Sequence, residues 1–157
     1  MPKIELSTTI NAAIQCCFDV SRDIDIHMAS TAHTGEKAIS GRTSGLIGLG
    51  ETVTWRAKHF GIWQNLTSKI TEFNSPNFFV DEMVEGAFKS FRHKHYFDKL
   101  NDSQTLMRDV FIFKSPLGVF GNLADRLFLK QYMTNLLVKR NLVIKKEAEA
   151  QTIADSQ

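Results

Sequence analysis

Residues 88–113 read FKSFRHKHYFDKLNDSQTLMRDVFIF. Two runs within this stretch, 88–97 and 105–113, have the alternation expected of β-strands, and the residues Asn101-Asp102-Ser103 between them favour a turn. Successive side chains of a strand point to opposite faces. The stretch therefore predicts a β-hairpin, with one face of its first strand formed by Phe91, His93, His95 and Phe97.

The register of this hairpin brings a carboxylate onto the face that carries the histidines. Pairing of Leu100 with Gln104 across the turn would set that register. The cross-strand pairs would then be His95–Asp109, His93–Phe111 and Phe97–Met107. Such a face either lines a ligand cavity or belongs to a core whose polar groups are satisfied.

The composition around the hairpin is that of a globular protein. A chain of 157 residues can bury a core as one domain, and its 43% hydrophobic and 23% charged residues are ordinary values. The net charge of +2 is too small to indicate nucleic-acid binding. Twelve phenylalanines, against two tyrosines and two tryptophans, suit a large core or the wall of an apolar pocket.

The cysteine pattern and the absence of apolar runs favour a cytoplasmic location. Cys16 and Cys17 are adjacent, which disfavours a disulfide between them and fits reduced thiols. The first residues contain no apolar signal-peptide core, and no run approaches the roughly 20 apolar residues of a membrane span. We expect no membrane insertion, and the sequence leaves the oligomeric state open.

The remaining pattern predicts an α+β protein. A strand at 3–9 is followed by a helix that Asn11 would cap and by a second short helix at 24–30. Further strands are expected at 36–44, 51–60, 64–73 and 78–85. Turns separate them at roughly ten-residue spacing, which is typical of an antiparallel meander.

A long helix is predicted from about Val119 to Ala150. Its apolar stripe is broad enough to require a wide packing surface, such as a curved sheet; the stripe includes Leu129, Met133, Leu136, Leu137 and Ile144. Basic residues toward its C-terminal end are interpreted as complementing the helix dipole; they are Lys130, Lys139, Arg140, Lys145 and Lys146. We expect one domain, 1–157, with a frayed polar tail at 151–157.

Five segments carry a resemblance to a known family. They are GLIGLGETVTWRAKHFG at 45–61, FVDEM at 79–83, FRHKHYF at 91–97, and Pro116-Leu117-Gly118 with Leu123-Ala124-Asp125. Together they resemble a bacterial subfamily of SRPBCC ligand-binding proteins, some of which are labelled cell-division inhibitors. The wider group includes START, polyketide-cyclase and Bet v 1-like proteins. The resemblance implies a helix-grip fold, in which a seven-stranded antiparallel sheet wraps around a long C-terminal helix, with two short helices after the first strand. It also implies a cavity between sheet and helix, without naming a ligand or a catalytic set.

Candidate site residues are those expected on the inward face of such a sheet. Trp55 and His59 share one face of their strand, and Trp55 offers a flat apolar wall with one N–H donor. The glycine-rich turn at 45–50 does not fit a phosphate-binding loop, and its apolar residues Leu46, Ile47 and Leu49 are interpreted as a gate. The expected cavity residues are Trp55, His59, Met83, Phe91, His93, His95, Phe97, Asp109, Phe111 and Met133.

The two histidines allow several interpretations. His93 and His95 would lie about 7 Å apart along one strand, a spacing that permits a shared metal if His59 or Asp109 supplies a third ligand. Hydrogen-bonded histidines in a half-polar cavity are the expected outcome, so we predict no metal and no cofactor. Exposed histidines, with Arg92 and Tyr96 facing inward, are the remaining alternative.

A pair formed by His95 and Asp109 would have two possible uses. The carboxylate would orient the imidazole and raise its basicity, as a general base requires. The imidazole would equally neutralise a buried carboxylate. The sequence places no serine or cysteine nucleophile beside the pair.

The sequence thus favours a protein that binds a small hydrophobic or amphipathic molecule, such as a lipid, polyketide or isoprenoid, in an internal cavity. The first alternative is a cyclase-type or hydrolase-type enzyme that uses His95 and Asp109. The second is an interaction protein whose cavity has closed into core. A cavity of several hundred cubic ångströms would separate the first two from the third.

Overall fold

The computed structural model of the chain describes residues 1–115, 123 and 128–157. The predicted start of the long helix near Val119, the segment Pro116-Leu117-Gly118 and the pair Ala124-Asp125 lie outside the described residues. The elements are, in chain order, β1 (Lys3–Ile10), α1 (Ile14–Ser21), α2 (Ile24–Ser30), the 3-10 helix η1 (Ala32–Thr34), β2 (Lys37–Gly41), β3 (Thr52–His59), β4 (Ile62–Asn74), β5 (Phe78–Glu85), β6 (Ser90–Asn101), β7 (Gln104–Lys114) and α4 (Lys130–Asp155).

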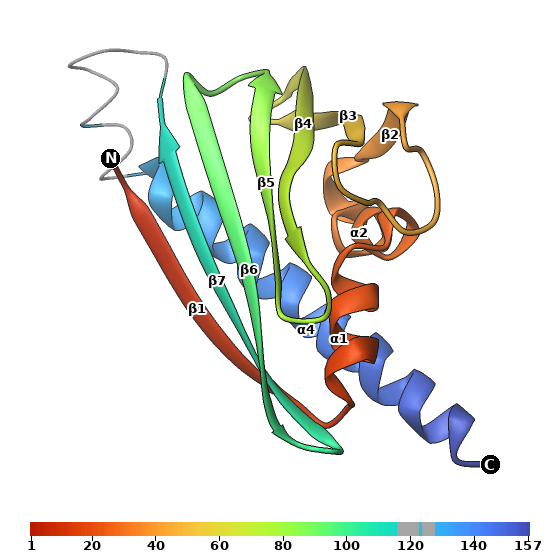
Figure 1. Cartoon of the computed structure of the whole chain (residues 1–157). Helices are drawn as coiled ribbons and strands as arrows, with labels where there is room; N and C mark the ends of the chain where they lie inside the picture. The colour runs from red at the N-terminus through yellow and green to blue at the C-terminus, as the bar shows by residue number, and fades with distance from the viewer. Residues whose placement is uncertain (116–122, 124–127) are drawn as a thin grey trace.

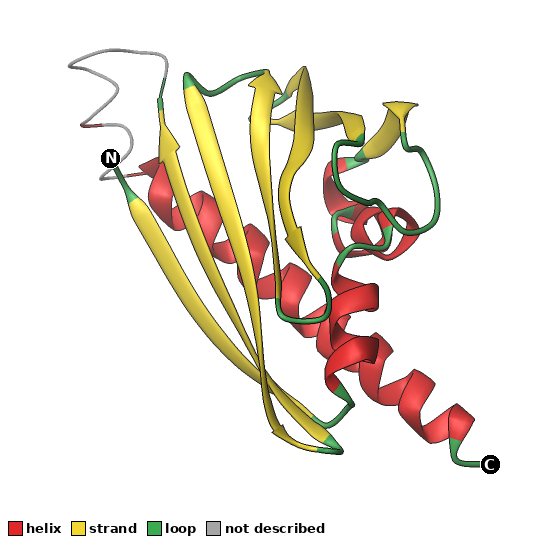
Figure 2. Ribbon diagram, viewed as in Figure 1, coloured by secondary structure: helices red, strands yellow, loops and turns green. Residues whose placement is uncertain are grey.

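The seven strands form one antiparallel sheet in the order β1-β7-β6-β5-β4-β3-β2. Strands β2 to β7 follow one another as the predicted meander, and β1 joins the sheet beside β7. Helix α4 crosses one side of the curved sheet, and α1 and α2 lie beside it (Figures 1 and 2). The predicted α+β architecture is therefore confirmed, including the two short helices after the first strand.

The β6–β7 hairpin has the predicted register everywhere except at its turn. His95 pairs with Asp109, as expected. The predicted pairing of Leu100 with Gln104 is wrong, because Asn101 pairs with Gln104 and Leu100 is the extra residue at a register shift. The Asn101 side chain explains the tighter turn, since its Oδ1 accepts a 2.9 Å hydrogen bond from the Ser103 backbone N–H.

Burial along the hairpin follows the predicted alternation. The inward positions of β6 are buried; they are Phe91, His93, His95 and Phe97. Arg92 lies on the other face, where it forms ion pairs with Glu72 and Glu82. The alternative in which Arg92 and Tyr96 face inward is therefore wrong.

The two short helices differ in how well the sequence predicted them. Helix α2 has the predicted bounds, and Asp23 caps it by accepting hydrogen bonds from the backbone of Asp25 and Ile26. The predicted cap of α1 is wrong, because that helix begins at Ile14. Asn11 is engaged elsewhere, since its backbone N–H donates to Glu149 on α4 at 3.0 Å.

Helix α4 continues beyond its predicted end at Ala150 and reaches Asp155, so most of the segment expected to fray is helical. Thr152 Oγ1 donates to the carbonyl of Ala148 at 2.9 Å within this last part. The buried face of α4 contains Leu137, Arg140, Asn141, Ile144 and Ala148. Neither α4 nor any other helix in the described ranges is long and apolar enough to cross a membrane.

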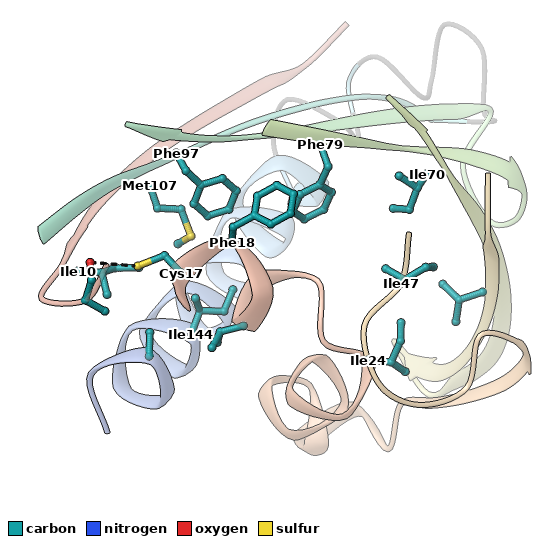
Figure 3. Packing of buried hydrophobic residues seen from close by; sticks show 14 of the residues in the cluster. Ile10, Cys17, Phe18, Ile24, Ile47, Ile70, Phe79, Phe97, Met107 and Ile144 are labelled. Atoms are coloured by element: carbon teal, nitrogen blue, oxygen red, sulfur yellow. Dashed lines mark hydrogen bonds between the residues drawn. The ribbon is translucent and has the colours of Figure 1, made fainter. Parts of the chain in front are cut away.

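Two apolar clusters form the core. The first is centred on Phe18 of α1, whose ring lies 5.5 Å from those of both Phe79 and Phe97, centroid to centroid (Figure 3). The second lies at the other end of the hairpin and contains Ile4, Phe91, Phe111, Phe113 and Leu137. The inward face of the hairpin is thus apolar at both ends, and its histidines and aspartate lie between the two clusters.

The adjacent cysteines are free thiols, as predicted. Cys17 is fully buried in the first cluster, with its Sγ 3.7 Å from the carbonyl oxygen of Ala12 (Figure 3). Cys16 is half-buried beside α4.

Candidate functional site: a pocket between the sheet and α4

A pocket of about 500 Å³ lies between the sheet and α4. Side chains from the five strands β3 to β7, from α2 and from the first turns of α4 line it. Most of this lining is apolar, and Trp55, Leu66 and Phe111 are among its larger members. The pocket also has a polar wall, which includes Asp81, His93, His95 and Arg140.

The structure brings seven of the ten predicted cavity residues to this pocket: Trp55, His59, Phe91, His93, His95, Phe111 and Met133. The other three lie just outside its lining. Phe97 packs in the first core cluster, and Met83 packs against the second. Asp109 is only 1% exposed and lies behind the two histidines, to which its carboxylate is hydrogen-bonded.

Six side chains form what we call the buried polar cluster: Asp81, His93, His95, Asp109, Arg140 and Asn141. Asp109 is its centre. Its Oδ1 atom lies 2.9 Å from Nε2 of His93, 3.0 Å from Nδ1 of His95 and 3.4 Å from Nη1 of Arg140. Its Oδ2 atom accepts a 2.7 Å hydrogen bond from the Asn141 side chain. The carboxylate therefore joins both histidines of β6 to the buried face of α4.

His95 is held between two carboxylates. Its Nδ1 faces Asp109, and its Nε2 lies 2.9 Å from Oδ2 of Asp81. The ring of Phe79 stacks on the imidazole with centroids 4.2 Å apart. An ionised carboxylate only accepts hydrogen bonds, so Nε2 of His95 donates to Asp81. Nδ1 of His95 also lies 3.4 Å from Nη2 of Arg140.

The pKa values in the cluster follow from these contacts. Burial by itself would raise the pKa of Asp109, but the hydrogen bonds from His93 and His95 and the charge of Arg140 together hold that pKa well below its usual value. Asp81 has a lowered pKa for the same kind of reason, with His95 as its hydrogen-bond donor. Burial, reinforced by the nearby His95, lowers the pKa of His93 to about 4. His93 is therefore neutral at pH 7 and donates from Nε2 to Asp109.

The predicted pair of His95 and Asp109 meets its distance requirement, because the two side chains are on one face and 3.0 Å apart. The general-base interpretation finds less support in the geometry. A base needs a free lone pair, and Asp81 occupies the second nitrogen of His95. The contacts of Asp109 with His93, His95 and Arg140 agree better with the alternative interpretation, in which these side chains compensate a buried carboxylate.

A second set of polar side chains also lines the pocket: His27, Glu36, His59 and Tyr132. Nε2 of His27 contacts Oε1 of Glu36 at 2.7 Å, and the His27 ring packs 4.3 Å from that of Trp55. His59 Nδ1 lies 2.7 Å from the hydroxyl of Tyr132 on α4. His59 is thus paired with a tyrosine. It does not take the role of third metal ligand that the sequence suggested for it.

The glycine-rich turn contributes one residue to the pocket. Ile47 is buried and lines the space, whereas Leu46 and Leu49 are exposed. The turn is tied to the short helices, because the Ile47 backbone N–H donates to the carbonyl of Arg22 at 3.2 Å. Ile47 is therefore the part of the proposed gate that contacts the pocket.

Sequence reasoning missed Asp81, Arg140 and Asn141. Asp81 pairs directly with His93 across β5 and β6, so a correct register would have placed both side chains on one face. Arg140 lies three residues after Leu137 and four before Ile144, which puts it on the buried stripe of α4. Its interpretation as a dipole-complementing surface residue is wrong, because it is only 6% exposed and contacts Asp109.

No protein-family model and no curated protein sequence matches the chain. Solved structures do match over nearly its whole length. The protein TTHA0849 from Thermus thermophilus superposes with a TM-score of 0.77 at 14% identity, over 96% of this chain and 99% of that one. The chain has the helix-grip fold.

Two further structures with this fold come from differently named proteins. The Zhui aromatase/cyclase from Streptomyces sp. R1128 superposes with a TM-score of 0.74 at 14% identity, over 94% of this chain and 93% of that one. A START superfamily protein from Mycobacterium smegmatis gives 0.71 at 11% identity, over 96% and 99% of the two chains. The structural neighbours thus extend across the SRPBCC and Bet v 1-like superfamily. At these identities, they establish the fold alone.

Proposed function

We propose that the pocket binds a small hydrophobic or amphipathic molecule, such as a lipid, a polyketide or an isoprenoid. The observation that carries this proposal is a mostly apolar space of about 500 Å³ between the sheet and α4, with a polar wall on one side. Ligand pockets in proteins typically measure about 300–1,000 Å³ and combine apolar linings with a few polar groups. A closed core would leave no space of this size.

The polar wall gives the proposed ligand a preferred orientation. Asp81, His93 and Arg140 line the pocket, whereas Asp109 and Asn141 lie behind them and hold them in place. A hydroxyl or carbonyl group of the ligand would be directed toward this wall. Its apolar body would lie against Trp55 and Phe111.

The resemblance noted in the sequence agrees with this proposal. START and aromatase/cyclase proteins are among the structural neighbours. From the sequence we also propose that the chain is related to the bacterial SRPBCC subfamily, some members of which are labelled cell-division inhibitors, and that it is located in the cytoplasm.

A fluorescence titration with N-phenyl-1-naphthylamine tests the proposal. This apolar probe emits strongly when it leaves water for an apolar site. We expect saturable binding of one probe per chain, and displacement of the probe by fatty acids or polycyclic aromatics. Fluorescence that rises linearly without saturation, or that no apolar competitor reduces, would count against a ligand pocket.

An enzymatic reaction in the same pocket is the second candidate, because His95 and Asp109 form the 3.0 Å contact that a general base would need. It requires Asp81 to release Nε2 of His95 when a substrate binds. Turnover of a polyketide-like or ester substrate that is lost in His95→Ala, while probe binding persists, would support this candidate. Probe binding without any turnover would leave the binding function alone.

A further inference from the structure

The structure assigns a divalent transition-metal site to Asp81, His93 and His95, at the polar wall of the pocket. Each residue offers one ligand atom, and these three atoms lie within 4.8 Å of one another. This inference goes beyond the proposed function, because neither apolar ligand binding nor acid–base catalysis requires a metal.

The backbone brings the three ligands together. His93 and His95 are inward-facing neighbours on β6, and their rings lie 3.8 Å apart, centroid to centroid. Asp81 is the direct partner of His93 on β5. The sequence indicated the two histidines of such a site, but it offered His59 or Asp109 as the third ligand and favoured no metal. In this proposal the third ligand is Asp81.

The spacing is close to what coordination requires. Ligands about 2.1 Å from a tetrahedral metal lie about 3.4 Å from one another. Asp81 Oδ2 and His95 Nε2 are 2.9 Å apart, and all three ligand atoms lie within 4.8 Å of one another. The Asp81 side chain is 20% exposed, which makes it the least enclosed of the three ligands.

Asp109 provides the outer support that metal-bound histidines usually have. Such histidines donate their second ring N–H to a carboxylate, which fixes the orientation and tautomer of the ring. Asp109 engages Nε2 of His93 and Nδ1 of His95 through the same oxygen. The nitrogens left for a metal are therefore Nδ1 of His93 and Nε2 of His95.

The donor set indicates the kind of metal. Two imidazoles and one carboxylate suit zinc, iron(II), cobalt or nickel, and they suit magnesium or calcium less well. All three residues line the pocket, so further coordination positions would face the space in which a ligand would lie. When a metal binds, it takes the place of the proton on Nε2 of His95, which passes to solvent.

The test uses the full chain without an affinity tag, first stripped with a chelator. Calorimetric titration with Zn²⁺ should show one site per chain, and Co²⁺ should give the visible absorption of a low-symmetry site with nitrogen ligands. Asp81→Asn and His93→Gln should weaken Zn²⁺ binding by at least about tenfold, and so should the supporting change Asp109→Asn, because outer partners typically contribute about 10- to 100-fold. His33→Gln, an exposed histidine on η1, is the matched control and should bind as the unaltered protein does.

A measurement on the unaltered chain keeps the test valid if a variant fails to fold. In protein labelled with ¹⁵N-histidine, Zn²⁺ should shift the ring resonances of His93 and His95 and leave that of His33 in place. The absence of stoichiometric binding, or a shift of His33 in place of the pocket histidines, would overturn the assignment. Probe fluorescence in the metal-free protein is read separately, so loss of the metal site leaves the proposed function intact.

Discussion

Oδ1 of Asp109 lies 3.0 Å from Nδ1 of His95, and each residue is only 1% exposed. The same oxygen also contacts His93 and Arg140. This carboxylate therefore compensates the positive charge that Arg140 buries between the sheet and α4. Ion pairs of this kind contribute little when intact, but removal of one partner leaves a buried charge uncompensated.

Asp109→Ala should consequently lower the free energy of unfolding by about 3–5 kcal/mol. Urea denaturation followed by circular dichroism measures this loss. Asp98→Ala is the matched control, because Asp98 forms an exposed ion pair with Arg108 on the same two strands, and exposed pairs contribute about 0–1 kcal/mol. Equal losses in the two variants would show that the buried carboxylate has no special role.

Ala57→Phe should reduce the affinity for apolar probes by about tenfold or more, equivalent to about 1.4 kcal/mol. Ala57 is 3% exposed and lines the pocket, so a larger side chain at this position takes space from the ligand. Lys58→Phe adds the same ring to the neighbouring exposed position of β3 and should leave the affinity unchanged. Unaltered binding by Ala57→Phe would place the probe somewhere else on the protein.

Glu36→Gln should destabilise the protein near pH 7 by about 1.5–3 kcal/mol, the range for hydrogen bonds to a charged group. Burial raises the pKa of Glu36, but hydrogen bonds from His27 and Thr31 outweigh that effect and the pKa is lowered. A carboxyl group with a lowered folded-state pKa stabilises the fold above its unfolded pKa, about 4.3, and this contribution is lost as the pH falls through the folded value.

The stability difference between Glu36→Gln and the unaltered protein should therefore shrink below about pH 4.3, as followed by denaturation at several pH values. Glu5→Gln, which alters an exposed side chain on β1, is the control and should change stability little at any pH. A difference for Glu36→Gln that stays constant down to about pH 3 would contradict the lowered pKa.

Cys16 should react with thiol reagents in the native protein, and Cys17 should react only after unfolding. Burial raises the pKa of Cys17 to about 11, so thiolate is scarce at neutral pH, and the sulfur is fully enclosed. Cys16 also has a pKa raised by burial, yet its side chain is only partly covered. Mass spectrometry after timed alkylation checks the order. In Cys16→Ser, rapid labelling of the native protein would contradict this prediction.

The sequence was most informative where alternation was unambiguous. The regular spacing of apolar and charged residues in 88–97 predicted which side chains of β6 face inward, and the register beyond the turn followed from pairing two such strands. The predicted pairing at the turn was wrong, because the Asn101 side chain accepts a hydrogen bond from the backbone of Ser103 and shortens the turn. The number of residues between the two strands does not reveal this hydrogen bond. The error is confined to the turn, because the β-bulge accommodates one extra residue and leaves the pairing of the rest of the strand unchanged.

The candidate site was less predictable, because its polar groups come from distant elements. Asp81 becomes a neighbour of His95 only through the pairing of β5 with β6. Arg140 resembles any basic residue on an exposed helix surface until the buried face of α4 is known. The volume of the pocket depends on how side chains such as Trp55 and Phe111 pack in three dimensions, which composition alone does not determine.

Native mass spectrometry of the protein purified from its own host tests the central claim most directly. The account predicts a fraction of the protein carrying one additional small molecule, which solvent extraction should identify as hydrophobic or amphipathic. The Ala57→Phe variant, prepared in the same way, should carry much less of it. A clean unliganded mass for the unaltered protein, together with no saturable binding of apolar probes, would contradict the proposal that this pocket holds a ligand.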